Sequence, residues 1–119
     1  MSQWSDKKRQ NSVGYFNQLI QKSYLFVMDD AGSIIGTVTI VPLYKLSGLK
    51  GSVEHVLVDE AYRGKGLGEK LMRHAIEYAK QQGMGKLFLT VEPERVVAKK
   101  LYQKLGFTKK ETDFYQLSL

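Results

Sequence analysis

Residues 51–79 read GSVEHVLVDEAYRGKGLGEKLMRHAIEYA, and the spacing of their apolar side chains changes once along the stretch. From Val53 to Val58 these side chains alternate loosely in a run rich in Val and Leu, which is typical of a strand. From Leu67 to Ala79 they recur every four residues, which predicts an amphipathic helix. A strand, a glycine-rich turn and the N-terminus of a helix therefore follow one another directly.

The turn, RGKGLG at residues 63–68, has the composition of an anion site. The first turn of a helix leaves about four backbone N–H groups without intrahelical partners, and the helix dipole adds positive potential there. Glycines at alternate positions permit positive φ and remove the Cβ atoms that would keep a ligand from the backbone. With Arg63 and Lys65 at the rim, the turn predicts a phosphate or pyrophosphate site. A flexible turn without a ligand is the alternative.

Two motifs resemble signatures of the GNAT superfamily of acetyl-coenzyme A dependent N-acetyltransferases. The first, [R/Q]-x-x-G-x-[G/A], is matched by residues 63–68, and the second, A-x-x-L-Y-x-K-L-G-F, by AKKLYQKLGF at residues 98–107. Other phosphate loops fit less well, because no Ser or Thr follows Lys65 and Glu69 stands where a dinucleotide fingerprint has glycine. The resemblance extends over residues 24–119 and includes the order and separation of the two motifs.

Strands come first in the chain and then alternate with helices, which indicates a mixed α/β sheet with helices on its faces. The resemblance implies a GNAT-like fold with a central, mostly antiparallel sheet, shortened at its N-terminus. The predicted elements are a helix from about Ser12, strands at Tyr24–Asp29 and Ser33–Val41 joined by a turn at 30–32, an edge, bulge or strand end near Pro42, a loop at 46–50, a strand at Lys86–Val91, a helix from Pro93 ended by Gly106, and two short strands after Phe107.

Size and composition narrow the class of protein. A chain of 119 residues predicts one domain, residues 1–119, with residues 1–11 flexible. It has no cysteine, which excludes a disulfide framework, a thiol nucleophile and a cysteine-based metal site. No apolar run is long enough to span a bilayer, and the N-terminus lacks a signal-peptide core, so we expect a cytoplasmic protein without a membrane partner.

The net charge of +6, from 18 Lys and Arg against 12 Asp and Glu, favours anionic partners. Coenzyme A, nucleic acid and an acidic protein surface all meet that description. Most of the basic residues are scattered, and no stripe of aromatic side chains accompanies them, which argues against a nucleic-acid surface. We therefore interpret the charge as solubility and attraction of the cofactor.

The resemblance implies how acetyl-coenzyme A would be bound, and no metal is expected. The pantetheine arm would lie beside the main chain of Val56, Leu57 and Val58. The pyrophosphate would accept hydrogen bonds from backbone N–H groups of the turn. Arg95 stands where the family often has Asn, which puts the usual hydrogen bond there in doubt. The residues expected to bind the cofactor are Val56, Leu57, Val58, Arg63, Gly64, Lys65, Gly66, Leu67, Gly68, Arg95, Ala98 and Tyr102.

Two residues are candidates for proton transfer. Tyr102 matches the family position that often protonates the departing thiolate, and the alternative is a half-buried aromatic on a helix face. Glu54 lies two residues before the expected thioester contact, and burial would raise its pKa toward that of a general base. A surface carboxylate is the equally weighted alternative for Glu54. Glu92 could orient an amine, cap a helix or lie on the surface, whereas His55 and His74 receive no catalytic role.

The acceptor side is less well supported than the cofactor side. Family members open with a strand and two helices before the first hairpin, and here only residues 1–23 precede Tyr24. Either the acceptor cleft is open, as for a peptide or protein amine, or a second copy of the chain completes it as a homodimer.

The leading hypothesis is an N-acetyltransferase that moves an acetyl group from acetyl-coenzyme A to a primary amine, in a small molecule or a protein, by direct transfer in a ternary complex. A module that binds coenzyme A or a partner without turnover is the second hypothesis. A basic nucleic-acid-binding domain is the third.

Overall fold

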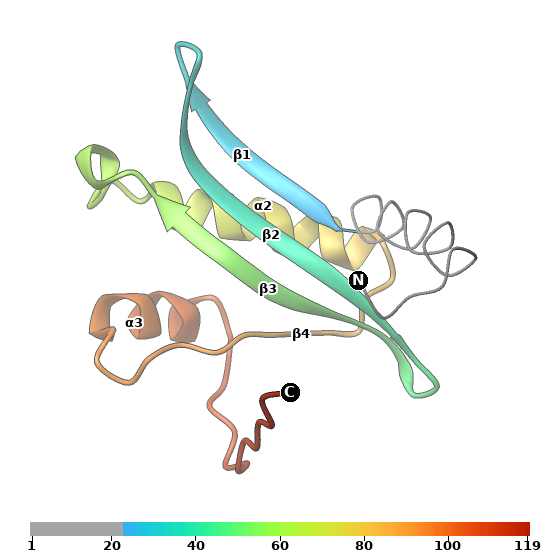
Figure 1. The fold of residues 1–119 in the computed structure, drawn as a ribbon. Coiled ribbons are helices and arrows are strands. Elements are labelled where there is room, and N and C mark those ends of the chain that lie inside the picture. The colour runs from blue at the N-terminus through green and yellow to red at the C-terminus, as the bar shows by residue number, and fades with distance from the viewer. Residues whose placement is uncertain (1–22) are drawn as a thin grey trace. The chain divides into compact units, whose positions relative to one another are not determined.

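The computed structural model describes residues 23–119, which form two compact units, one ending at Leu89 and the other running from Thr90 to Leu119. The expected helix from Ser12 lies outside the described residues. Among the described residues, the first unit contains a four-stranded sheet and a helix (Figure 1). Its elements are β1 Tyr24–Asp30, β2 Ser33–Lys45, β3 Gly48–Val58, the 3₁₀ turn η1 Glu60–Tyr62, α2 Leu67–Gln81 and β4 Lys86–Phe88. The second unit contains α3 Val96–Lys104.

The sheet has the order β1-β2-β3-β4, with antiparallel pairing between β1 and β2 and between β2 and β3. Parallel pairing joins β3 to β4. The predicted mixed, mostly antiparallel sheet is therefore confirmed. Ala31 and Gly32 both have positive φ (51° and 89°) and connect β1 to β2, as a tight two-residue hairpin turn requires.

The hairpin between β2 and β3 is longer than the sequence predicts. We expected a loop at residues 46–50, but Lys45 pairs with Gly48, so only Leu46 and Ser47 form the turn. Pairing extends this far because each further pair of residues forms its hydrogen bonds next to a pair that is already in register. Pro42 lies inside β2, opposite Gly51. β1 begins opposite Ile40, so within the described residues Pro42 has a strand neighbour on one side only, which suits its missing N–H.

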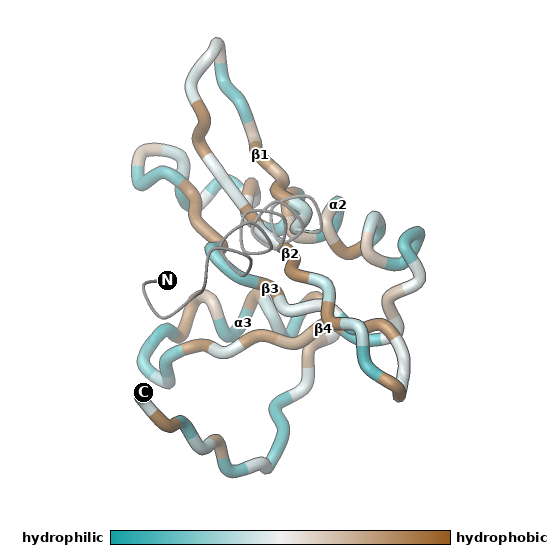
Figure 2. Tube along the Cα trace, turned by 45° about the vertical axis from the view of Figure 1, so that its right-hand side comes forward, coloured by the Kyte–Doolittle hydropathy of each residue, from teal (hydrophilic) through white to brown (hydrophobic). Residues whose placement is uncertain are grey.

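Helix α2 packs on one face of the sheet and runs behind β1, β2 and β3 in the view of Figure 1. Its buried residues are Leu71, Met72, Ala75 and Ala79, which confirms the predicted apolar stripe. On the sheet they face a core that includes Val38, Ile40 and Val53. Hydrophobic positions recur along all three long strands in Figure 2, as expected for a sheet with one covered face.

Both helices end through glycine, as the sequence predicts. After α2, the N–H of Met84 donates to the carbonyl of Ala79 at 3.1 Å, and Gly83 has φ 83°. After α3, the N–H of Phe107 donates to the carbonyl of Tyr102 at 2.9 Å, and Gly106 has φ 102°. This crossed pattern is a Schellman motif, which only a residue tolerant of positive φ completes without strain.

The second unit differs from the sequence-based prediction at both ends. The helix does not begin at Pro93 but at Val96, because a turn with the Arg95 N–H bonded to the Glu92 carbonyl at 3.0 Å comes first. Val97, in the first turn of this helix, is 84% exposed. In the first unit, β4 is also shorter than predicted, with Lys86–Phe88 in place of Lys86–Val91.

The two short strands expected after Phe107 are not formed within the described residues. A strand needs the backbone of a neighbour, and residues 108–119 are exposed throughout. Apolar side chains in this segment are therefore left in contact with solvent: Phe114, Tyr115, Leu117 and Leu119.

The close packing around Gly51 provides a test of this core. A Cβ at Gly51 would lie 2.7 Å from Leu87 Cδ2 and 2.8 Å from the Met84 sulfur. We expect Gly51→Ala to lower the free energy of unfolding by about 1–3 kcal/mol through overpacking. Gly85→Ala is the matched control, because the nearest atom to its Cβ would be the Leu49 carbonyl oxygen at 3.9 Å. Urea denaturation of both variants checks this, and equal stabilities would contradict the packing.

Candidate functional site

The end of β3 is bulged. Thr37 pairs with Leu57 and Thr39 pairs with Glu54, so the register shifts between them and β3 carries one extra residue. His55 adopts φ 53°, a left-handed backbone that non-glycine residues rarely occupy. The Thr37 hydroxyl donates a hydrogen bond of 3.1 Å to the His55 carbonyl oxygen. Bulges leave the extra residue outside the ladder and re-aim the strand, often beside functional sites.

The second edge of β3 is open over the same stretch. Its pairing with β4 spans only Lys50 to Ser52, and β3 continues to Val58 without another strand partner in the part of the chain that is described. Val56, Leu57 and Val58, which the resemblance assigns to the pantetheine arm, all lie on this open part. Leu57 is 62% exposed, and Val56 and Val58 are half-buried.

Two hydrogen bonds hold the turn after β3 against the sheet, and a third lies within the turn itself. The Asp59 N–H donates to the Ile35 carbonyl at 2.7 Å, and an Asp59 carboxylate oxygen accepts from the Ala61 N–H at 3.0 Å. The Arg63 guanidinium donates from Nε to the Val58 carbonyl at 2.9 Å. Arg63 was expected to add mobile charge at the rim. Instead its side chain fastens the turn to the strand.

The backbone of the turn matches the predicted anion site in part. Gly64 and Gly66 have φ of 80° and 76°, and a Cβ on either would meet no protein atom within 4 Å. Gly66 is the N-cap of α2 and has no capping side chain, while Leu67 and Gly68 are the first two residues of the helix. The Arg63 N–H, however, already donates to the Glu60 carbonyl at 3.3 Å. The donors that remain for an anion therefore begin at Gly64.

Lys65 and Tyr62 complete the rim of the turn. Lys65 Nζ lies 5.3 Å from the centroid of the Tyr62 ring, within range of a cation–π contact. The Tyr62 hydroxyl donates to an Asp30 carboxylate oxygen at 2.5 Å and so links the turn to the tip of the β1–β2 hairpin. This hydrogen bond is the main cause of a raised Tyr62 pKa, and the negative charge of Asp30 adds to it.

Glu54 lies at the surface, His74 contacts an aromatic ring, and His55 has an unusual backbone conformation. Glu54 is exposed and lies on the sheet face opposite α2, so the burial on which its role as a base was argued is not found in the structure. The His74 ring makes an edge contact with Phe26 of β1, with ring centroids 5.8 Å apart. The positive φ of His55 was missed by sequence reasoning, since nothing in a run of Val and Leu signals a bulge.

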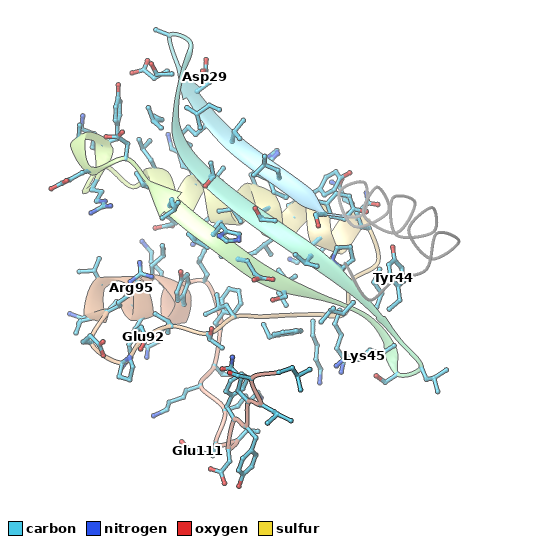
Figure 3. The ribbon with its side chains drawn as sticks, in the orientation of Figure 1. Asp29, Tyr44, Lys45, Glu92, Arg95 and Glu111 are labelled. Atoms are coloured by element: carbon cyan, nitrogen blue, oxygen red, sulfur yellow. The ribbon has the colours of Figure 1, made fainter. Side chains whose placement is uncertain are left out.

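The second unit holds the other motif. Tyr102 is 7% exposed, and its ring packs edge-on against Phe107 with centroids 5.9 Å apart. Burial raises the pKa of Tyr102, and the positive charge of Arg95 partly opposes that shift. Arg95 lies at the start of α3, with Glu92 in the segment before it (Figure 3), and both are exposed. Ala98 is half-buried on α3.

The structure describes no group of three or more His, Asp or Glu side chains placed to hold a metal ion between residues 23 and 119. Over the same residues, no helix combines the length and apolar character needed to cross a membrane.

The raised pKa of Tyr62 predicts a pH-dependent contact. Its folded-state pKa lies above the ordinary value of 10.0, so the contact stabilises the fold below about pH 10 and is lost as the pH rises through the folded pKa. We expect Asp30→Asn to lower the pKa of Tyr62, measured by phenolate absorbance and assigned with Tyr62→Phe. Glu60→Gln removes a neighbouring charge without breaking the hydrogen bond and should leave that pKa raised. An unchanged pKa in Asp30→Asn would refute the assigned cause.

Comparison with known proteins identifies the family of this chain. The model of the Acetyltransferase (GNAT) family matches residues 2–107. An uncharacterised N-acetyltransferase of Bacillus subtilis is 29% identical over 116 residues, covering 96% of this chain and 44% of that protein. An L-methionine sulfoximine/L-methionine sulfone acetyltransferase of Pseudomonas paraeruginosa is 32% identical over 100 residues, covering 82% of this chain and 58% of that protein. The chain thus spans about half the length of these relatives.

Among solved structures, a putative acetyltransferase from Agrobacterium tumefaciens superposes with a TM-score of 0.76 at 25% identity, covering 92% of this chain and 79% of that one. The family match extends across both motifs and both units of the structure. The chain therefore belongs to the GNAT family of acetyltransferases.

Proposed function

We propose that this chain is an N-acetyltransferase that transfers an acetyl group from acetyl-coenzyme A directly to a primary amine in a ternary complex. One observation carries the proposal: a bulged, half-open strand leads without a linker into a glycine turn and an uncapped helix N-terminus. These features lie on consecutive residues of one compact unit. An extended acyl arm ending in a diphosphate has the same order of chemical groups.

The diphosphate would bind the turn. The left-handed Gly64 and Gly66 leave open space in front of the backbone, and the N–H groups from Gly64 to Gly68 lie at the positive end of the α2 dipole. Lys65 adds a positive charge at the rim. Arg63 would add the other N–H groups of its guanidinium, since only Nε is bonded to the Val58 carbonyl, whereas its backbone N–H is bonded to Glu60.

The acyl arm would lie along the open edge of β3. Backbone groups of Val56 and Val58 would bond to the pantetheine amides as a further strand does, with Leu57 between them paired to Thr37 of β2. An N–H beside the bulge would polarise the thioester carbonyl. Donors aimed at the oxygen that gains charge commonly provide the largest catalytic term. We also assign Ala98 and Arg95 to the coenzyme, with Arg95 offering a cation to a phosphate.

The reaction needs two proton transfers. The neutral amine attacks the thioester carbon, a C–N bond forms, and the C–S bond breaks to release a thiolate. Tyr102 would give its phenolic proton to that sulfur. Its raised pKa keeps the phenol protonated at neutral pH, as an acid requires. Glu54 would accept the proton from the amine, directly or through water, and because Glu54 is exposed the bound acceptor itself must shield it from solvent.

The acceptor is proposed only as a class. The Pseudomonas relative is named as an acetyltransferase of small amino-acid analogues, which favours a small primary amine. An amine on a protein is the alternative if the acceptor side is open, and a homodimer is the alternative if a second copy closes it. A cytoplasmic setting stays a prediction from the sequence.

A binding module without turnover is the second candidate. The exposure of Glu54 and the replacement of Asn by Arg95 favour it, since both affect proton transfer or acyl positioning rather than the phosphate turn. Calorimetric titration with acetyl-coenzyme A, followed by measurement of thiol release with a panel of amines, separates the candidates. Binding with turnover supports the enzyme, binding alone supports the module, and no binding refutes both.

The turn is tested by a matched pair of glycine variants. Gly66→Val places a side chain between the backbone and the diphosphate, so we expect the Kd for coenzyme A to rise at least about tenfold. Gly83→Val is the control, because Gly83 has a similar φ of 83°, has the same open surroundings and lies at the other end of α2. It should lose similar stability but bind coenzyme A normally. Equal affinities in the two variants would show that the turn is not the phosphate site.

The role of Tyr102 as the general acid is tested by removing its hydroxyl oxygen. Tyr102→Phe keeps the ring contact with Phe107 but cannot donate a proton, so we expect kcat to fall at least about tenfold while coenzyme A affinity is nearly unchanged. Tyr115→Phe, at a side chain that is 88% exposed, is the control for loss of a phenol. Wild-type kcat in Tyr102→Phe would remove Tyr102 from the mechanism.

A further inference from the structure

The bulge in β3 is held by a residue that neither motif contains. Thr37 lies on β2, opposite Leu57, and its hydroxyl reaches back to the His55 carbonyl at 3.1 Å. Through this hydrogen bond, a side chain of β2 is joined to the backbone of the bulge. The two groups are separated by 18 positions in the sequence, so the contact depends on the pairing of the strands.

The conformation at His55 needs such support. Its φ of 53° places the Cβ close to the backbone, and a non-glycine residue stays there only when its surroundings determine it. The alternative for β3 is a regular ladder with an extended residue at position 55. That change would move every following side chain to the other face of the sheet. It would also turn the backbone of Val56 and Leu57 away from its observed direction.

We propose that Thr37 is a positioning residue for acetyl transfer, acting through the His55 carbonyl to fix the backbone that polarises the thioester. The inference rests on the proposed function. The hydroxyl holds the bulge in its left-handed form, and the bulge directs the N–H group of Val56 toward the carbonyl of the acyl group. Thr37 itself touches neither the coenzyme nor the amine.

The role predicts a split between binding and turnover. The diphosphate is bound by the turn from Gly64 to Gly68, which Thr37 does not contact, so affinity for coenzyme A depends little on the bulge. Charge on the thioester oxygen develops only during the reaction, so a misdirected donor lowers kcat. A displacement of about 1 Å at a reacting group can cost about a hundredfold in rate, and loosening one hydrogen bond should cost about tenfold.

The test uses four variants of the full chain: Thr37→Val, Thr37→Ser, His55→Gly and the double variant that combines His55→Gly with Thr37→Val. Thr37→Val preserves the shape of the side chain and removes the hydroxyl, whereas Thr37→Ser keeps the hydroxyl. We expect Thr37→Val to lower kcat about tenfold with the Kd for coenzyme A within about twofold, and Thr37→Ser to retain most of the wild-type kcat. In a His55→Gly background, where positive φ carries no strain, the same Thr37→Val change should have a clearly smaller effect.

A readout independent of activity accompanies the kinetics. Backbone NMR shifts of residues 54–58 should change in Thr37→Val and return in Thr37→Ser. Wild-type kcat in Thr37→Val, equal impairment of the Val and Ser variants, or parallel losses of kcat, coenzyme A affinity and Tm would each overturn the positioning role. Absence of thiol release by the wild-type chain would instead refute the proposed function, while the NMR comparison would still show whether Thr37 holds the bulge.

Discussion

The hydrogen bond between the Arg63 guanidinium and the Val58 carbonyl joins the two halves of the proposed coenzyme site. On one side of it lies the bulged strand, and on the other the glycine turn and the α2 N-terminus. The Tyr62–Asp30 hydrogen bond and the packing of α2 on the sheet connect the same two halves. The bond from Asp59 to Ile35 ties the same point to β2. The distance between the acyl end and the phosphate end of the site is therefore set by the sheet rather than by a mobile loop.

This arrangement changes how the first motif is understood. Its arginine is easily taken for a phosphate ligand, because it is a cation next to a glycine turn. In the structure Arg63 uses both its side chain and its N–H within the protein. The guanidinium keeps its other N–H groups for an anion, and in the proposed site the backbone donors belong to the residues that follow. A motif can thus be matched in every position while its most prominent side chain has a structural role.

Local signals predicted local structure well. The four-residue spacing of α2, the glycines that end both helices and the Ala31–Gly32 turn depend on contacts between near neighbours in sequence, and all are present. The bulge at His55 could not be predicted this way, because it arises from the register between β2 and β3. The predicted start of α3 was wrong because of a local contact. Pro93 suits a first helical position, but the turn bond from Arg95 to Glu92 takes precedence.

The same limit applies to the site. Backbone donors in the turn followed from the glycine spacing, whereas the burial expected of Glu54 depended on what covers that face of the sheet. The strands expected after Phe107 also required a partner that the sequence pattern cannot identify. Alternating apolar residues indicate that a segment can form a strand, and only a neighbouring backbone decides whether it does.

The second motif raises the question of how a sequence signature separates an enzyme from a binding module. Its last two residues have a structural explanation: Gly106 and Phe107 complete the Schellman motif, and Phe107 packs against the ring of Tyr102. A phenylalanine at position 102 would make the same ring contact. The hydroxyl therefore adds nothing that the helix end requires, and placing it in a mostly buried side chain carries a desolvation cost. A costly group that the fold does not need is better explained by chemistry than by packing, and this favours the catalytic interpretation over the module.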